Sequence, residues 1–345
     1  MTTAHSLIAK IEAGSVLNRL AAEFLMEELL SGRIDTPGIV RLLEALNLRR
    51  ITSPELSGFA SVMRRHAAPV FSQTEPKPEN MVDTCGTGGD DSGTFNISTA
   101  AAIVASAAGA RVAKHGNRSA SSRCGSADVL ESLGVSIDLP LFRCGQAIRE
   151  INIGFLFAPA AHGAARHAAP ARKQIGRRTI FNLLGPLTNP AGAQMQILGV
   201  FNADLIDLVA ETLADLGVKR AFILHGAGHL DEISMAGETQ IAEVRNGTVR
   251  RFTVTPEEFG LKRTPLEALK GGNAQENAAL IQQVLLGQPG ARKDIVIANA
   301  AAALLLSGNA NDLRSAAELA TQAIQSGAAT NKLHQLKEFT LRPAQ

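Results

Sequence analysis

The sequence from Met81 to Ala100 reads MVDTCGTGGDDSGTFNISTA, and this stretch decides the fold. An apolar strand pattern at Met81–Asp83 leads into a glycine-rich turn, and a helical, alanine-rich segment at Ala100–Ala108 follows. A strand, a glycine-rich turn and a helix in this order are typical of an α/β domain. Because glycine lacks a Cβ atom, the backbone of this turn can adopt positive φ and approach a ligand closely.

The glycine-rich turn is expected to bind an anion. Successive N–H groups in such a turn can form an anion-binding nest, and the helix after it adds free N–H groups and a favourable dipole. Ser98 or Thr99 is the expected N-cap of this helix. The turn matches neither the P-loop nor the dinucleotide-binding Gly-x-Gly-x-x-Gly pattern, so a plain tight turn is the alternative interpretation.

A second polar loop follows the next expected strand. Lys114 and Arg118 supply two cations there, and the loop also contains the neutral polar residues Asn117, Ser119, Ser121 and Ser122. Together the two loops suit a ligand with several phosphates and hydroxyls, and a solvated surface loop is the alternative. The net charge of +2 over 345 residues is too balanced for a nucleic-acid-binding or membrane-surface protein. Lys114 and Arg118 are therefore expected to be local ligand contacts.

Four runs of residues, in this order and spacing, resemble the anthranilate phosphoribosyltransferase family of the nucleoside phosphorylase/phosphoribosyltransferase superfamily. They are Asp83–Thr99, Lys114–Leu133, Asn182–Pro190 and Leu230–Ser234, and the resemblance covers nearly the whole chain. Members of this family transfer the 5-phosphoribosyl group from phosphoribosyl pyrophosphate to the amine of anthranilate, in tryptophan biosynthesis. The resemblance implies that activity, two small-molecule substrates and a requirement for Mg²⁺.

The resemblance also implies the site residues. Those expected to contact phosphoribosyl pyrophosphate are Gly86, Gly89, Asp90, Thr94, Asn96, Ile97, Ser98, Thr99, Lys114, His115, Gly116, Asn117, Arg118, Ser119, Ala120, Ser121, Ser122 and Ser126. Those expected to contact anthranilate are Gly86, Asn117, His162 and Arg172. Those expected to hold Mg²⁺, which prefers oxygen ligands, are Ser98, Asp231 and Glu232.

Two of these assignments depend on the resemblance. Arg172 would bind the anthranilate carboxylate through its guanidinium. It lies in the basic run Arg166–Arg178, where an arginine is solvated by default. Asp231 and Glu232 would by default be an exposed acidic pair at a turn. No side chain is expected to act as general base, because the nitrogen of an arylamine already holds a free lone pair at pH 7.

Three positions depart from the family pattern. Asp91 stands where glycine is usual, Cys124 where serine is usual, and Gly163 follows His162 where proline is usual. Asp91 adds a negative charge near the phosphate loop, and Gly163 loosens a turn near the expected anthranilate pocket. These departures bear on the affinity for the acceptor more than on the reaction.

The residues before Met81 predict a small helical domain at 1–71 and a polar linker with two prolines at 72–80. Apolar residues recur at the spacing of one helical face, and capping signals stand at Thr36-Pro37 and Thr52–Glu55. By resemblance, residues 170–192 pack back onto this domain and make it discontinuous. The domain could also supply the surface of a homodimer.

Residues 81–345 predict a larger α/β domain with a central, mostly parallel sheet. The expected strands are Met81–Asp83, Arg111–Ala113, Val135–Ile137, Gly154–Ala158, Gln196–Val200, Ala221–Leu224, Thr239–Arg245 and Thr248–Val254. Asn246-Gly247, between the last two, is a strong hairpin signal.

Composition indicates a protein of the cytoplasm. The three cysteines, Cys85, Cys124 and Cys144, show no disulfide framework, and the N-terminal residues lack the apolar core of a signal peptide. The alanine-rich stretches are too short to span a bilayer. Two other functions fit parts of the pattern: a pyrimidine nucleoside phosphorylase, which shares this architecture, and a nucleic-acid-binding relative without the transferase activity.

Overall fold

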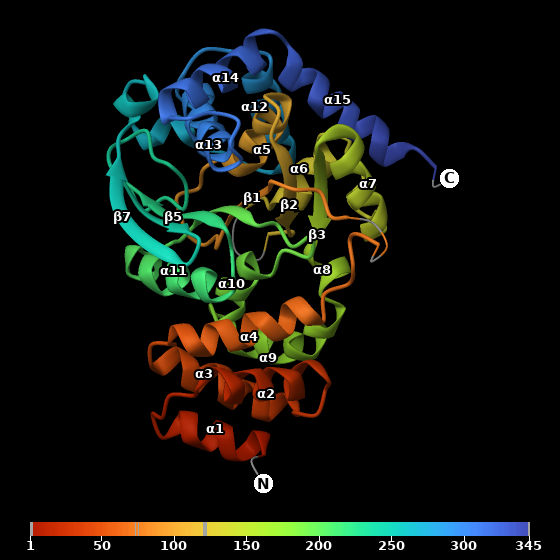
Figure 1. Cartoon of the computed structure of the whole chain (residues 1–345), viewed down its shortest axis with the longest axis vertical. Coiled ribbons are helices and arrows are strands. Elements are labelled where there is room, and N and C mark those ends of the chain that lie inside the picture. The colour runs from red at the N-terminus through yellow and green to blue at the C-terminus, as the bar shows by residue number, and fades with distance from the viewer. Residues whose placement is uncertain (1–2, 73, 75, 120–122, 344–345) are drawn as a thin grey trace.

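The computed structural model describes residues 3–72, 74, 76–119 and 123–343. Figure 1 shows a bundle of helices below a larger α/β region, with the N-terminus at the free end of the bundle. The bundle contains α1 (Ala4–Glu12), α2 (Arg19–Leu30), α3 (Thr36–Leu48) and α4 (Ser53–Arg65). The capping box expected at Thr52–Glu55 starts α4, whereas Asp35, one residue before the expected cap, starts α3 by accepting the N–H of Gly38.

A later part of the chain returns to this bundle. It comprises η1 (Gly163–Ala168), α9 (Ala169–Ile175), α10 (Phe181–Leu184) and η2 (Pro186–Thr188). α9 packs on α3, and η2 packs on α4. Phe181, Leu184 and Leu187 lie in the same hydrophobic core as Leu25 and Phe59 of the bundle. The returning segment thereby connects the bundle to the cleft described below.

The larger region is built on a seven-stranded sheet in the order β3-β2-β1-β4-β5-β6-β7. The strands are β1 (Met81–Gly86), β2 (Arg111–Gly116), β3 (Ile153–Phe157), β4 (Met195–Gly199), β5 (Arg220–Gly226), β6 (Thr239–Arg245) and β7 (Thr248–Val254). The first five are parallel, and β6 and β7 are antiparallel additions. The predicted mostly parallel sheet is confirmed, and the hairpin lies at Asn246 and Gly247, which both have positive φ.

One predicted strand is wrong. Val135–Ile137 is not a strand and pairs with no strand of the described chain. The apolar side chains of Val135 and Ile137 are buried in the core, which is what gave the segment its strand pattern. Its backbone is used elsewhere: Val135 N–H bonds to the Leu130 carbonyl at the end of α6 (Ser126–Ser132), and Ser136 N–H bonds to Thr340 Oγ1.

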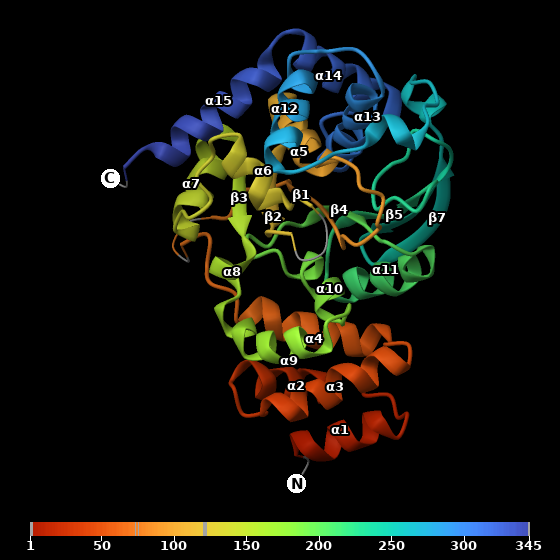
Figure 2. The same ribbon diagram turned by 180° about the vertical axis from the view of Figure 1, so that it is seen from behind.

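Helices cover both faces of the sheet. The remaining ones are α5 (Ile97–Ala107), α7 (Leu141–Ile151), α8 (Ala158–Ala161), η3 (Ala203–Leu205), α11 (Ile206–Asp215), η4 (Pro256–Phe259), η5 (Leu266–Leu269), α12 (Ala274–Leu285), α13 (Ala291–Leu306), α14 (Leu313–Gln325) and α15 (Ala328–Leu341). Figure 2 shows α5, α12 and α13 on one side of the sheet and α11 on the side nearer the bundle. α5 and α13 pack closely because both present alanines, so the backbones approach each other.

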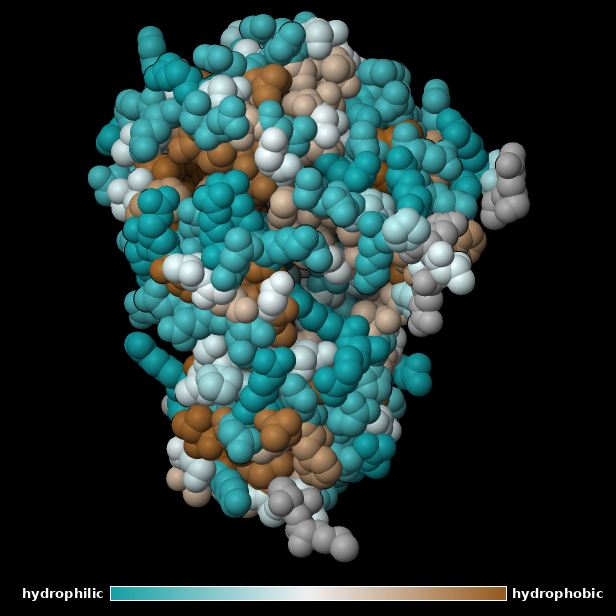
Figure 3. Space-filling model, in the orientation of Figure 1, coloured by the Kyte–Doolittle hydropathy of each residue, from teal (hydrophilic) through white to brown (hydrophobic). Residues whose placement is uncertain are grey.

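Alternate residues of each strand enter different cores, as the pleat of a strand requires. Ile197 and Phe222 pack with α5 and α13, whereas Leu198 and Ile223 pack with α11 in the core that continues into the helical bundle. No helix of the described residues is long and apolar enough to span a membrane. The surface in Figure 3 is mostly hydrophilic, with apolar areas over the helical bundle and in a hollow of the upper region.

Candidate active site

A cleft lies at the carboxyl ends of the parallel strands, where the chain order of the sheet reverses beside β1. After β1 the chain builds β2 and β3 on one side, and it later adds β4 on the other. Such switch points are where open α/β sheets bind ligands. The cleft has a volume of about 560 Å³.

The cleft collects most of the predicted site residues. Its lining includes Gly86, Gly89, Asp90, Thr94, Asn96, Ile97, Ser98, Thr99, Lys114, His115, Gly116, Asn117, Arg118, Ser119, Ser126, Arg172, Asp231 and Glu232. His162 does not line it, although its ring centroid is 5.2 Å from that of His115. Ala120, Ser121 and Ser122 lie outside the described residues.

The first loop closes tightly against the acidic pair. Gly88 and Gly89 have φ of 64° and 75°, in the left-handed region that favours glycine. The Gly88 N–H donates to Asp231 Oδ2 at 2.9 Å. A Cβ atom on Gly86 would lie 2.3 Å from the same oxygen, so any larger residue would displace Asp231. The backbone of this loop was expected to approach a ligand closely, and in this structure it approaches the Asp231 carboxylate.

The N-terminus of α5 also faces a carboxylate. The helix begins at Ile97 with Asn96 in the cap position, so the prediction of Ser98 or Thr99 as the N-cap is wrong. The Ser98 N–H donates to Glu232 Oε1 at 3.0 Å. A helix N-terminus stabilises negative charge through its free N–H groups and its dipole. Glu232 thus occupies a donor that can equally bind a ligand anion.

Three carboxyl groups crowd together at this point. Asp231 N–H lies 3.5 Å from Asp90 Oδ2. Burial, and then the negative charge of Asp90, raises the pKa of Asp231. Burial and the charge of Asp231 raise the pKa of Glu232, while Lys114 opposes that rise. Negative groups that repel one another this strongly suit a cation.

The donor set fits Mg²⁺ in particular. Carboxylate and hydroxyl oxygens are available from Asp231, Glu232 and Ser98. No three His, Cys, Asp or Glu side chains of the described residues are grouped so as to close around a metal ion. Mg²⁺ is characteristically bound by one or two carboxylates, with waters and substrate phosphates as its other ligands. The residues present therefore fit this ion.

Lys114 is buried beneath the loops. It is 4% exposed, and its Nζ donates to the Thr84 carbonyl at 2.6 Å and to Ser98 Oγ at 3.3 Å. Burial lowers the pKa of this ammonium, and the nearby charge of Asp83 opposes the lowering. Lys114 thus places positive charge under the N-terminus of α5.

A buried polar network supports Lys114, and it was not predicted from the sequence. Asp83 Oδ1 accepts the His115 N–H at 3.1 Å, and its Oδ2 accepts from Asn189 Nδ2 at 2.8 Å. Burial raises the pKa of Asp83 to about 6, although the Asn189 bond and Lys114 lower it. Asp83 is a polar residue within an apolar strand pattern, and it was the signal in the sequence that could have pointed to this network.

The second loop is fastened to α6. The guanidinium of Arg118 contacts Asp128 Oδ1 at 3.0 Å and Glu131 Oε1 at 2.9 Å. The other oxygen of Asp128 accepts the N–H groups of Ser119 and Gly125. Arg118, predicted as a phosphate contact, is thus held by two carboxylates one helical turn apart. That spacing, visible in the sequence, was the missed signal.

The side of the cleft toward the bundle carries Arg172. Its guanidinium lies 5.1 Å from the centre of the Phe181 ring. Burial lowers its pKa, with no carboxylate of the described residues raising it. His115, which lines the same cleft, is buried and neutral, since burial lowers its pKa to about 3. A cation that no carboxylate of the described residues pairs with, beside an aromatic ring, suits an aromatic carboxylate.

Comparison with known proteins agrees with this geometry. Residues 78–330 match the glycosyl transferase family, a/b domain, and residues 5–67 match the glycosyl transferase family, helical bundle domain. The anthranilate phosphoribosyltransferases of Desulforamulus reducens and Pelotomaculum thermopropionicum are each 49% identical over 333 residues, which cover 96% of this chain and 95% of each relative. The chain belongs to the anthranilate phosphoribosyltransferase family.

Solved structures of the family have the same fold. The crystal structure of anthranilate phosphoribosyltransferase from Thermus thermophilus superposes with a TM-score of 0.91 at 43% identity, covering 97% of this chain and 99% of that one. The Saccharomyces cerevisiae enzyme in complex with PRPP and Mg has a TM-score of 0.87 at 26% identity, covering 98% and 97%.

The three departures from the family pattern have separate surroundings. Asp91 lies 3.2 Å from Arg178 Nη2, and the same guanidinium bonds to the Gly89 carbonyl. Its charge is therefore partnered near the phosphate loop. The Cys124 carbonyl accepts a bond from Asn96. A Cβ atom on Gly163 would meet no other group within 4 Å, so a larger residue would find room there.

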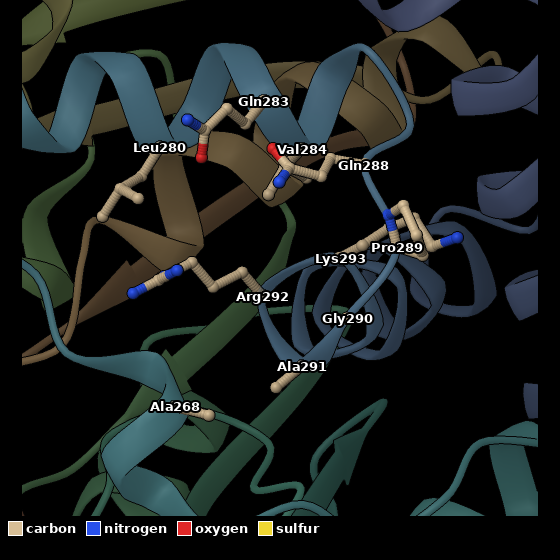
Figure 4. A pocket seen from close by; sticks show the side chains of 10 residues that line it. All are labelled: Ala268, Leu280, Gln283, Val284, Gln288, Pro289, Gly290, Ala291, Arg292 and Lys293. Atoms are coloured by element: carbon tan, nitrogen blue, oxygen red, sulfur yellow. The ribbon is translucent and has the colours of Figure 1, made fainter.

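A second hollow, of about 300 Å³, lies between α12 and the start of α13. Figure 4 shows Gln283, Gln288 and Arg292 around it, with Ala268 of η5 below. Arg292 Nη2 donates to the Lys270 carbonyl at 3.2 Å, which supports the segment after η5 from outside the cleft. None of the predicted site residues lines this hollow.

Proposed function

We propose that this chain transfers the 5-phosphoribosyl group from phosphoribosyl pyrophosphate to the amine of anthranilate, giving N-(5-phosphoribosyl)anthranilate and pyrophosphate, as its family relatives are named to do. The observation that carries the proposal is the convergence of the glycine loop, Lys114, Arg172 and the acidic pair in one cleft. In this step the bond from C1 of the ribose to the pyrophosphate oxygen breaks, and its electron pair leaves with pyrophosphate. The lone pair of the amine forms the C1–N bond, and the nitrogen then releases a proton to solvent.

The phosphate groups would be held by backbone donors and by Lys114. The N–H groups of the glycine loop and of the α5 N-terminus now bind Asp231 and Glu232. A bound pyrophosphate group would compete for them. Ser98, Asp231 and Glu232 would hold Mg²⁺, which when bound would neutralise the charge that develops on the leaving pyrophosphate. The S. cerevisiae relative is described in complex with PRPP and Mg, which supports this assignment.

Fixed electrostatics and positioning would lower the barrier at C1. Lys114 is pre-oriented by Thr84 and Ser98, so it needs no rearrangement as charge develops. Arg172 would orient anthranilate through a bidentate contact with its carboxylate, beside Asn117 and Gly86. His162 would support that pocket from behind His115.

The reaction can be tested directly. Folded protein with phosphoribosyl pyrophosphate, Mg²⁺ and anthranilate should consume anthranilate, seen as loss of its fluorescence. Uridine and thymidine with inorganic phosphate should yield no free base. A protein that leaves anthranilate intact but cleaves a nucleoside would instead be the phosphorylase.

The acceptor assignment has its own test. Arg172→Ala should raise the KM for anthranilate much more than that for phosphoribosyl pyrophosphate, because a charge-assisted contact worth roughly 1.5–3 kcal/mol is lost. Arg177, which pairs with Glu44 away from the cleft, provides the control: Arg177→Ala should leave both KM values near wild type. Equal damage to both substrates by Arg172→Ala would contradict the assignment.

We also infer a division into domains: residues 1–71 with 170–192 form the small domain, 72–80 the linker and 81–345 the α/β domain.

We further infer a cytoplasmic homodimer that forms through the helical bundle. Val16, Leu20 and Phe24 are exposed large apolar residues of the bundle, and Leu20 is 76% exposed. Leu20→Glu should shift sedimentation from dimer to monomer. Leu286, equally exposed at the end of α12, is the control, and Leu286→Glu should leave the dimer intact.

A further inference from the structure

A directional chain of hydrogen bonds crosses the wall of the cleft. The Gly272 N–H donates to Asn277 Oδ1 at 2.7 Å, and Asn277 Nδ2 donates to Asn96 Oδ1 at 3.0 Å. Asn96 Nδ2 then donates to the Cys124 carbonyl at 3.2 Å. Asn277, on α12, is 2% exposed. Three distant parts of the sequence are thereby joined through two side-chain amides.

The two ends of this chain fix its direction. The backbone N–H of Gly272 can only donate, so Asn277 must turn its oxygen toward it. The Asn277 amide nitrogen then faces Asn96, which must present its own oxygen. The Asn96 nitrogen is left to face the Cys124 carbonyl, which can only accept. Both amides therefore have a single orientation that satisfies every bond.

The segments joined in this way all belong to the cleft. Asn96 precedes α5, Cys124 ends the second loop, and Gly271 and Gly272 follow η5, and all of them line the cleft. The connection is tight, because a Cβ atom on Gly271 would lie 2.7 Å from both Asn277 Oδ1 and the Phe95 nitrogen. The Gly271 N–H also bonds to the Gly93 carbonyl at 2.9 Å. The glycine loop and the segment after η5 thus form one wall.

We propose that Asn277 is a positioning residue for phosphoribosyl pyrophosphate. It would not touch the ligand's reacting atoms; it holds Asn96, and through Asn96 the end of the second loop, at a fixed distance from the N-terminus of α5. The proposal rests on the function proposed above. Breaking this chain of hydrogen bonds would let the two phosphate-binding loops move apart. The wall that carries Arg172, on the bundle side of the cleft, would keep its contacts.

Asn277→Asp tests the proposal with little change of size. At pH 8 the carboxylate still accepts the Gly272 N–H, but it has no N–H to donate to Asn96. Leaving a buried acceptor without its partner is costly, and the KM for phosphoribosyl pyrophosphate should rise about tenfold, which corresponds to 1.4 kcal/mol. The KM for anthranilate should change less than about twofold. Calorimetric binding of phosphoribosyl pyrophosphate with Mg²⁺ should weaken by the same factor.

Asn273 on the same helix provides a matched control. Its Oδ1 caps α12 by accepting the Glu276 N–H at 3.0 Å, and it has no bond to Asn96. Asn273→Ala should lower the melting temperature but leave the KM for phosphoribosyl pyrophosphate within about twofold of wild type. This variant separates a weakened helix from a broken chain of hydrogen bonds.

A double mutant tests the connection itself. In the Asn96→Ala background Asn277 no longer has the Asn96 oxygen to bind, so adding Asn277→Asp should raise the KM for phosphoribosyl pyrophosphate by less than about twofold. Two effects that multiply would overturn the proposal. So would Asn277→Asp raising both KM values equally, or neither, in an active protein. A wild-type protein with no activity would instead defeat the proposed function.

Discussion

Asn189 donates its side-chain amide to the buried carboxylate of Asp83 at 2.8 Å and to the Ala113 carbonyl at 2.8 Å. It follows η2, in the segment that returns to the helical bundle, whereas Asp83 and Ala113 lie on β1 and β2. One residue thus ties that segment to two central strands directly below the phosphate loops. The side of the cleft that carries Arg172 is held in register with the side that carries Lys114.

Removing this amide should destabilise the protein. Asn189→Ala leaves the buried Asp83 oxygen without its donor, so we expect a loss of roughly 1–3 kcal/mol, measured from urea unfolding. Asn202 is an exposed asparagine whose side-chain oxygen accepts the Asp204 N–H, and Asn202→Ala should cost clearly less. Similar losses for the two variants would show that the Asp83 contact contributes no more than an ordinary surface bond.

Loss of the acidic pair should change the metal requirement selectively. Asp231→Asn with Glu232→Gln keeps an oxygen for the Gly88 and Ser98 N–H groups but removes two negative charges. The Mg²⁺ concentration for half-maximal turnover should rise, and the KM for anthranilate should change little. Glu238→Gln, an exposed neighbour outside the cleft, should leave the Mg²⁺ titration as it is. An unchanged titration in the double variant would remove both residues from the metal site.

Glu55 should make stability depend on pH in the acid range. Burial alone would raise its pKa, but bonds from Arg49, the Leu17 N–H and Thr52 lower it below the ordinary value of 4.5. A carboxyl with a depressed pKa stabilises the folded state above its unfolded pKa, and this contribution is lost as the pH falls through the folded value. Glu55→Gln should therefore lower the urea midpoint at pH 7, and the difference from wild type should shrink below about pH 4.5.

Glu12 is the comparison for that experiment. It pairs with Arg41 on the surface of the bundle, where solvent screens the interaction. Glu12→Gln should shift the midpoint at pH 7 less than Glu55→Gln does. A Glu55 variant whose deficit is the same at pH 7 and pH 4 would point to lost packing and not to the carboxylate charge.

Local signals in the sequence were sufficient for much of the fold. The Asn246-Gly247 turn places both hairpin strands with their observed ends, since positive φ at two successive residues leaves few alternatives. Val135–Ile137 misled because burial produces the same apolar pattern as strand pairing. What decides between the two is the bonding of the backbone, here a local bond to Leu130 at the end of α6 and a tertiary bond to Thr340.

The cleft shows a similar limit. The glycines and cations expected to touch a ligand stand in recognisable loops, so the lining of the cleft could be predicted. Asn277 and Asn189 act across long sequence separations, to Asn96 and Asp83, and no local pattern announces such partners. Arg118 stays a predicted phosphate contact, and its two carboxylate partners on α6 were not predicted from the sequence.

We expect that no side chain of this site is an essential general base. Anthranilate's nitrogen needs no deprotonation before it attacks, and the histidines near the cleft are poorly suited to the role. Burial, and then His162, lowers the pKa of His115 to about 3, and burial lowers that of His162. His225 is buried, with its Nδ1 2.8 Å from the Val200 carbonyl. Each single His→Asn variant should therefore lose less than about tenfold in turnover at saturating substrates and Mg²⁺, with the exposed His5→Asn as control. General bases contribute ~10²–10⁴-fold, so a ~10³-fold loss in one variant that still binds both substrates would identify that histidine as the base.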